Sequence, residues 1–168
     1  AMPIEQFLGR KKAHSGSTLL SFDSDANGVK ELVLGDVSFD NLTFLYNGGA
    51  VDDAVMYSQD TVFPVYDVPA DMTIFPGAFY ADVDNDQKRD LLVSPNAKNL
   101  SRNFESIWYY NNAGADDFPD FEHQMNNFLQ DDMIDVGEGA QPIFFDHNGD
   151  GLMDLLLSNY GYFQDGGN

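Results

Sequence analysis

The sequence predicts an all-β fold, and three observations support this. Of the 28 acidic residues, 23 are Asp and 5 are Glu, and Asp favours turns where Glu favours helices. The apolar runs are short and rich in branched and aromatic residues, as strands are. Such runs flank an acidic loop three times along the 168 residues. With 43% hydrophobic residues, the chain has enough apolar material to bury a core.

The net charge of the chain is strongly negative, at −20. Nucleic acids and anionic membrane surfaces are therefore not expected as partners, because both are negatively charged. No apolar run approaches the roughly 18 residues that a membrane span needs, so membrane insertion is not expected either. The sequence contains no Cys, which excludes disulfides, thiolate metal sites and cysteine nucleophiles.

Three segments of the chain resemble one another at a nearly constant interval. Their acidic loops begin at Asp23, Asp82 and Asp146, which are 59 and 64 residues apart. In each segment a short apolar run precedes a loop with polar side chains at its positions 1, 3, 5 and 9, and a second apolar run follows. This pattern predicts a β-hairpin with an oxygen-rich turn. The segments span residues 19–36, 79–96 and 143–160.

Further matches extend each hairpin into a unit of four strands. Leu45-Tyr46-Asn47-Gly48 resembles Tyr109-Tyr110-Asn111-Asn112, which predicts a third strand ending in a turn. Phe7-Leu8 resembles Phe128-Leu129, which predicts the outer strand of a preceding unit. Four-stranded units of about 40 to 60 residues are typical of β-propeller blades.

The expected organisation is an incomplete propeller fragment of about two and a half blades. Residues 1–15 are expected to hold a cloning scar and the outer strand of a preceding blade. Blade 1 is expected over residues 16–75, blade 2 over 76–130 and a partial blade 3 over 131–168. Because a closed propeller needs roughly four to eight blades, we expect the blade edges to pair with further chain or with a second copy.

The three loops carry the ligands that calcium prefers. Alternate residues of a tight loop can turn their oxygens towards one centre, and the main-chain carbonyl of position 7 adds a ligand. Crowded carboxylates repel one another unless a cation lies among them, and a flexible oxygen cage favours Ca²⁺ over Mg²⁺. The sequence thus predicts up to three Ca²⁺ sites. Their expected ligands are Asp23, Asp25, Asn27, Val29 and Glu31 in loop one, Asp82, Asp84, Asp86, Lys88 and Asp90 in loop two, and Asp146, Asn148, Asp150, Leu152 and Asp154 in loop three.

Two alternatives compete with this interpretation. An EF-hand loop begins in the same way but needs a bidentate Glu at position 12, where this chain has Leu34, Val93 and Leu157. The flanks also lack the helices that an EF-hand requires. The other alternative is that the loops are solvated Asp-rich turns without a metal.

The loops resemble those of the FG-GAP/VCBS repeats found in integrin α-subunit propellers and many bacterial surface proteins, which read D-x-D-x-D-G-x-x-D-L. Residues 139–142, Gly-Ala-Gln-Pro, also resemble the Gly-Ala-Pro element of that family, with an inserted Gln. The resemblance covers most of the chain. It implies a calcium-binding β-propeller that is secreted or on the cell surface, with the loops joining the first two strands of each blade. Gln87 replaces the family's Gly at position 6 of loop two, so we expect a strained or different turn there.

The leading functional interpretation is a non-enzymatic, calcium-stapled propeller fragment that serves adhesion and binds a protein or a glycan. An accessory or scaffold part of an extracellular carbohydrate-active enzyme is the alternative, and a purely architectural role is a third. The three His residues are scattered, and neither a G-x-S-x-G motif nor a glycine-rich phosphate loop occurs. The long connection from Val51 to Pro76 is the candidate ligand surface. Its aromatic residues are Tyr57, Phe63, Tyr66 and Phe75.

Overall fold

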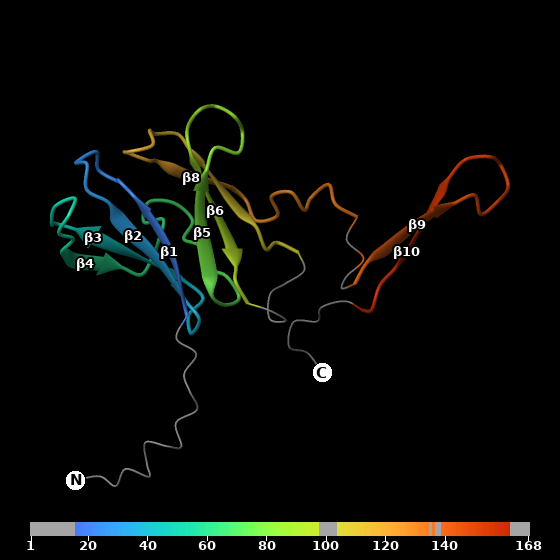
Figure 1. Ribbon diagram of the computed structural model, residues 1–168, viewed down its shortest axis with the longest axis horizontal. Helices are drawn as coiled ribbons and strands as arrows, with labels where there is room; N and C mark the ends of the chain where they lie inside the picture. The colour runs from blue at the N-terminus through green and yellow to red at the C-terminus, as the bar shows by residue number, and fades with distance from the viewer. Residues whose placement is uncertain (1–15, 98–103, 135, 137–138, 162–168) are drawn as a thin grey trace, which may run out of the picture.

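The computed structural model describes residues 16–97, 104–134, 136 and 139–161. These residues form ten β-strands and no helix. The strands make two four-stranded antiparallel sheets and one separate hairpin (Figure 1). The prediction of an all-β fold with four-stranded antiparallel units is confirmed. In this part of the chain no helix has the length and apolar character needed to cross a membrane.

Each sheet is a meander in which neighbouring strands follow one another in the chain. The first sheet contains β1 (Ser17–Phe22), β2 (Glu31–Asp36), β3 (Leu42–Asn47) and β4 (Met56–Asp60). The second contains β5 (Pro76–Ala81), β6 (Asp90–Pro95), β7 (Trp108–Asn112) and β8 (Phe121–Met125). The hairpin is formed by β9 (Gln141–Phe145) and β10 (Asp154–Ser158). The two sheets lie within the predicted ranges 16–75 and 76–130, and the identity of those ranges as propeller blades stays a prediction.

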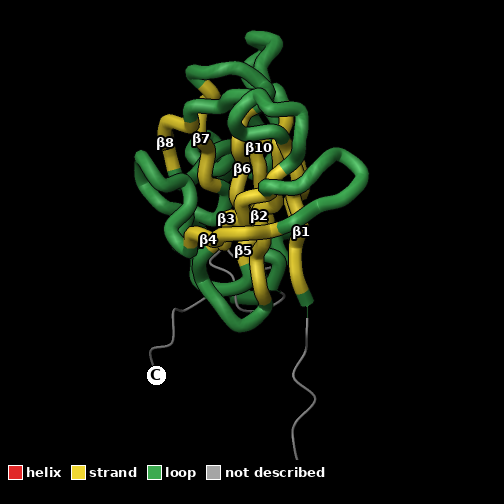
Figure 2. The backbone as a smooth tube through the Cα atoms, turned by 90° about the vertical axis from the view of Figure 1, so that its left-hand side faces the viewer, coloured by secondary structure: helices red, strands yellow, loops and turns green. Residues whose placement is uncertain are grey.

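The two sheets pack face to face, and the core lies between them. Strands β1, β2 and β3 all contact β5, the first strand of the second sheet, and Figure 2 shows the strands of both sheets gathered together. Aromatic rings dominate the interface, with the ring of Phe22 5.1 Å from that of Tyr80 and 5.9 Å from that of Phe121. The first pair is tilted and the second is edge-on, and such ring pairs add to the gain from burial. The core comprises Phe22, Val33, Leu42, Phe44, Phe63, Ala70, Met72, Leu91, Val93, Tyr110 and Phe121.

The sheets turn opposite faces towards this core. Side chains alternate between the faces of a strand, and in β2 the buried member near the centre is Val33, two residues after loop position 9. In β6 the buried members are Leu91 and Val93, one and three residues after the same position. Leu92, the counterpart of Val33, therefore lies on the outer face of the second sheet.

Two matches made from the sequence need correction. In the first sheet Leu45 pairs with Leu32, and in the second sheet Tyr110 pairs with Leu91. Because Leu32 and Leu91 each follow loop position 9, Asn47 is equivalent to Asn112 and not to Asn111. The predicted alignment was wrong by one residue, because two adjacent Asn residues make the register ambiguous. Phe128 lies in a turn after β8, not in an outer strand. Phe7 and Leu8 lie outside the described residues.

The β9–β10 hairpin lies apart from the two sheets in Figure 1. Its strands pair in register, with Asp154 opposite Phe145 and Leu156 opposite Ile143. Apolar residues are exposed on both faces of the hairpin, including Phe144 at 66% and Leu156 at 55%. An isolated two-stranded hairpin is marginal in water, so these faces need a partner.

Replacing Tyr110 with Phe should raise stability. The Tyr110 hydroxyl is buried and has no hydrogen-bond partner among the described residues, and an unsatisfied buried group costs about 1–3 kcal/mol. We expect Tyr110→Phe to raise the free energy of unfolding by about 1 kcal/mol in urea denaturation. The matched control is Tyr80→Phe, which removes a hydroxyl that donates to the Asp116 carbonyl oxygen at 3.1 Å and should lower stability. Equal effects of the two variants would contradict this account.

Candidate metal centres

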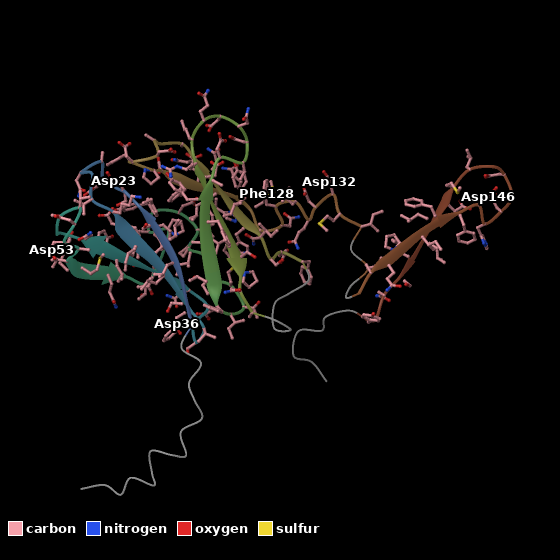
Figure 3. All side chains as sticks on the ribbon, viewed as in Figure 1. Asp23, Asp36, Asp53, Phe128, Asp132 and Asp146 are labelled. Carbon is pink, nitrogen blue, oxygen red and sulfur yellow. The ribbon has the colours of Figure 1, made fainter. Side chains whose placement is uncertain are left out.

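All three acidic loops lie in hairpin turns between the first two strands of their units, as the sequence predicts. Loop one joins β1 to β2, loop two joins β5 to β6, and loop three joins β9 to β10. Figure 3 labels Asp23 and Asp146, which open the first and the third loop. Each loop therefore connects two directly paired strands. The conformation of the loop helps to set the register in which these two strands pair.

The first residue of each loop closes the turn across five residues. Its carboxylate accepts a hydrogen bond from the main-chain N–H of position 6. The N···O distances are 2.7 Å for Asp23, 3.0 Å for Asp82 and 2.8 Å for Asp146. A tight loop leaves its N–H groups without strand partners, and here the loop supplies the acceptors itself.

Positions 3 and 5 repeat this arrangement in every loop. The side-chain oxygen of position 3 accepts from the N–H of position 5, at 3.2 Å for Asp25, 3.0 Å for Asp84 and 2.9 Å for Asn148. The side-chain oxygen of position 5 accepts from the N–H of position 7, at 2.6, 2.8 and 2.8 Å in the three loops. These Asx turns direct the oxygens of alternate residues into the loop. Ligation by the position 7 carbonyl oxygens of Val29, Lys88 and Leu152 stays a prediction.

Position 9 supplies the acid that ties the second strand back to the start of the loop. Its carboxylate accepts from the N–H of position 2, at 2.9 Å for Glu31, 3.2 Å for Asp90 and 2.9 Å for Asp154. Asp90 is only 1% exposed, and its other oxygen accepts from the N–H of Asn112 at 2.9 Å. Burial raises the pKa of Asp90 above the usual value, against the opposing effect of these N–H donors.

Every loop has left-handed backbone at positions 4 and 6. Position 4 has φ of 60° at Ala26, 65° at Asn85 and 78° at Gly149. Position 6 has φ of 81° at Gly28, 74° at Gln87 and 86° at Gly151. Of the two possibilities expected for Gln87, the structure therefore shows the same turn with a residue that strains it, because a Cβ disfavours positive φ.

Carboxylate oxygens converge in loops one and two. Asp23, Asp25 and Glu31 each offer an oxygen within 4.8 Å of the others, and so do Asp82, Asp84 and Asp86. Asp90 is not in the second group. In loop three, which the structure describes completely, three carboxylates do not converge in this way, and the Asn148 amide donates to Asp150 at 3.0 Å. The oxygen-only donor sets fit a hard cation such as Ca²⁺.

The carboxylates of loop two also act on a neighbouring residue. Burial, followed by the charges of Asp90, Asp84, Asp86 and Asp82, raises the pKa of Tyr109 to about 12. In loop three, the N–H of Gly151 is the main cause that lowers the pKa of Asp146. Loop two, with four Asp residues, is the most anionic of the three loops.

Two Asn residues connect loops one and two to the rest of their sheets. This connecting role was not predicted from the sequence. Asn112 donates to the Arg89 carbonyl at 3.0 Å and accepts from the N–H groups of Gly114 and Asp120. Asn47 donates to the Lys30 carbonyl at 3.0 Å in the same way. The common pattern Asn-x-Gly-Ala at residues 47–50 and 112–115 is the signal that could have revealed it.

An aromatic pocket of about 240 Å³ lies beside loop one. Phe63 forms part of its buried wall, and Tyr66 lines it while fully exposed. Tyr46 adds a third ring, and the carboxylates of Asp25 and Asp120 stand at the same pocket. The connection from Val51 to Pro76 thus supplies a pocket wall through two of its four aromatic residues, and it also contains strand β4. A second, polar hollow of about 330 Å³ at the opposite strand ends includes Trp108.

Comparison with known proteins gives no match. The chain matches no protein-family model, no curated protein and no solved structure.

Replacing Gln87 with Gly should relieve the strain in loop two. The cost of left-handed backbone for a residue with a Cβ is roughly 1–2 kcal/mol, so we expect Gln87→Gly to raise the free energy of unfolding by about 1 kcal/mol. The mirror control is Gly28→Ala in loop one, where an added Cβ meets no atom within 4 Å and only the backbone strain changes. That variant should lose stability. Urea denaturation of both variants in EDTA measures the two effects. A lower stability of Gln87→Gly would contradict the presence of backbone strain at Gln87.

Proposed function

We propose that this chain is a non-enzymatic calcium-binding module of the FG-GAP/VCBS propeller type, from a secreted or cell-surface protein that serves adhesion. One observation carries the proposal: three loops far apart in the sequence have the same internal hydrogen bonds at positions 1, 3, 5 and 9. The recurrence of one hydrogen-bond scaffold in three loops supports a common ligand-binding loop rather than three unrelated Asp-rich turns. In two loops, three carboxylates also converge within 4.8 Å, which is unfavourable without a cation.

Calcium in these loops acts as a structural staple. The carboxylates of Asp23, Asp25 and Glu31 hold the ion in loop one, and those of Asp82, Asp84 and Asp86 hold it in loop two. The ion supplies positive charge that cancels their repulsion and ties the first strand of each sheet to the second. Loop three offers Asp146, Asn148, Asp150 and Asp154 on the same scaffold, without three converging carboxylates. No step of catalysis is assigned to these residues, because each one closes a hairpin.

The way the two sheets stack supports a propeller. Blades in a ring each offer one face to the blade before and the opposite face to the blade after. The face of the first sheet that carries Val33 packs against the face of the second sheet that carries Leu91. The outer face of the second sheet, with Leu92 and the 58% exposed Phe79, is the counterpart of the Val33 face. In a propeller, this outer face would pack against the face of the β9–β10 hairpin that carries Leu155. Leu155 follows Asp154 as Leu91 follows Asp90.

The ligand-binding part of the proposal rests on the aromatic pocket beside loop one. Glycan sites and protein-binding pockets commonly combine exposed rings with a few polar groups. Tyr46 and Tyr66 supply rings, and Asp25 and Asp120 supply hydrogen-bond acceptors. Asp25 also belongs to loop one, so calcium binding and ligand binding share a residue.

Calcium should raise the thermal stability of the chain. With the millimolar affinities of extracellular modules, each site adds about 0.4 to 1.4 kcal/mol at roughly 1 mM Ca²⁺. We expect a higher melting temperature in Ca²⁺ than in EDTA by differential scanning calorimetry, and a smaller rise with Mg²⁺ at the same concentration. The isosteric variant Asp84→Asn keeps the acceptor for the N–H of Asp86 and should reduce the rise. An unchanged melting temperature in Ca²⁺ would count against the proposal.

Removing the exposed ring of Tyr66 should weaken ligand binding. Because stacking on a ring contributes about 0.5–1.5 kcal/mol beyond area burial, we expect Tyr66→Ala to weaken binding at least several-fold on a glycan array or in a cell-adhesion assay. Tyr160→Ala is the control, since Tyr160 is 84% exposed and does not line the pocket. Equal binding by the two variants would exclude this pocket as the ligand site.

A further inference from the structure

The turn between β7 and β8 lies against loop one of the other sheet. The main-chain N–H of Ala26 donates to the carbonyl oxygen of Asp117 at 2.7 Å. Ala26 is the left-handed residue at position 4, between the side chains of Asp25 and Asn27 that point into the loop. The second sheet therefore holds loop one between two of its expected ligands, Asp25 and Asn27.

The same turn also binds loop two, through hydrogen bonds to the Asp116 carboxylate. One carboxylate oxygen accepts from the main-chain N–H of Arg89 at 2.7 Å, and the other accepts from the Arg89 Nε at 2.8 Å. The Arg89 N–H is the main cause that lowers the pKa of Asp116. Arg89 occupies position 8, between the expected carbonyl ligand Lys88 and the acid Asp90. Its guanidinium also lies 4.6 Å from the centre of the Tyr80 ring.

Further hydrogen bonds hold this turn in place. The Tyr80 hydroxyl donates to the carbonyl oxygen of Asp116 at 3.1 Å, and Asn112 holds the two ends of the turn through Gly114 and Asp120. Figure 1 shows the turn between the loop that joins β1 to β2 and the loop that joins β5 to β6. One hydrogen-bonded segment therefore connects the two loops.

The first sheet offers an internal comparison. Its β3–β4 turn has the same form, with Ala50 bonded to Asp53 as Ala115 is bonded to Phe118. Val51 stands where the second sheet has Asp116, and it is 84% exposed. A carboxylate that holds position 8 is thus a specific addition to the second sheet and not a requirement of the turn.

We propose that Asp116 is a positioning residue that couples the two loops, so that calcium bound in loop two favours calcium binding in loop one, and the reverse. This inference rests on the proposed calcium function. Calcium in loop two orders the backbone around Lys88 and Arg89, and Asp116 transmits that order to Asp117 and Ala26. Loop one then loses less conformational freedom when it binds its own ion, which is positive cooperativity.

The test is a Ca²⁺ titration of the ¹⁵N-labelled chain, followed by two-dimensional NMR. The amide of Gly28 reports loop one and the amide of Gln87 reports loop two, so the sites are read separately from loop three. Asp84→Asn disables loop two and Asp25→Asn disables loop one, each with its internal hydrogen bond kept. We expect the affinity of loop one to fall about fivefold in Asp84→Asn, and that of loop two to fall by a similar factor in Asp25→Asn.

Two variants of the turn separate the contact from its charge. Asp116→Ala removes both hydrogen bonds to Arg89, and in that background we expect disabling one loop to leave the affinity of the other unchanged. Asp117→Ala is the matched control, because it removes one charge from the same turn and keeps the carbonyl that accepts from Ala26. The fivefold dependence should persist in it. If Asp116→Ala loses its dispersed amide signals, Asp116→Asn replaces it and should reduce the dependence.

The outcomes distinguish this inference from the function on which it rests. If neither amide shifts with Ca²⁺, the proposed function fails and the inference falls with it. If both loops bind calcium and neither affinity depends on the other loop, the inference is overturned and the proposed function stands. A dependence that survives Asp116→Ala, or that Asp117→Ala abolishes equally, overturns the role of Asp116.

Discussion

The structure depends on one constraint: tight loops between paired strands must satisfy their own main-chain N–H groups. Each acidic loop does so with side-chain oxygens at positions 1, 3, 5 and 9. The same geometry points those oxygens inwards, so a candidate cation site and a hairpin turn share one set of hydrogen bonds. The loops set the register of β1 with β2 and of β5 with β6, and the packing of the sheets follows from that register.

Asn residues extend this constraint from the loops to the whole sheets. Asn47 and Asn112 each join loop position 8 to the turn between the third and fourth strands. In the second sheet Asp116 strengthens the connection through Arg89, and Asp117 carries it across to the first sheet. The ion pair between Arg89 and Asp116 is partly exposed at both side chains, so by itself it adds little to stability. It acts together with main-chain hydrogen bonds. Loops one and two and the turns between the third and fourth strands therefore form one hydrogen-bonded region at the ends of the strands.

Sequence reasoning succeeded where the information is local. The spacing of Asp, Asn and Glu predicted the three hairpin loops, because side chains that bond neighbouring N–H groups need no distant partner. It failed where the register depends on the ladder: Asn111 was matched in place of Asn112, and Phe128 was assigned to a strand although it lies in a turn. A shift of one residue changes the face of every side chain, and only cross-strand pairing resolves it. The Asp116–Arg89 pair was missed because 27 residues separate its members.

By itself the sequence determined the all-β class, the position of each acidic loop and the ligands that each loop can offer. These properties follow from local turn chemistry and from short apolar runs, which act within a few residues. Tertiary structure alone decided which sheet faces meet, which carboxylates converge, and how the turn at Asp116 and Asp117 links loop one with loop two. Those properties come from contacts between residues tens of positions apart, and their geometry exists only after the sheets have paired and packed.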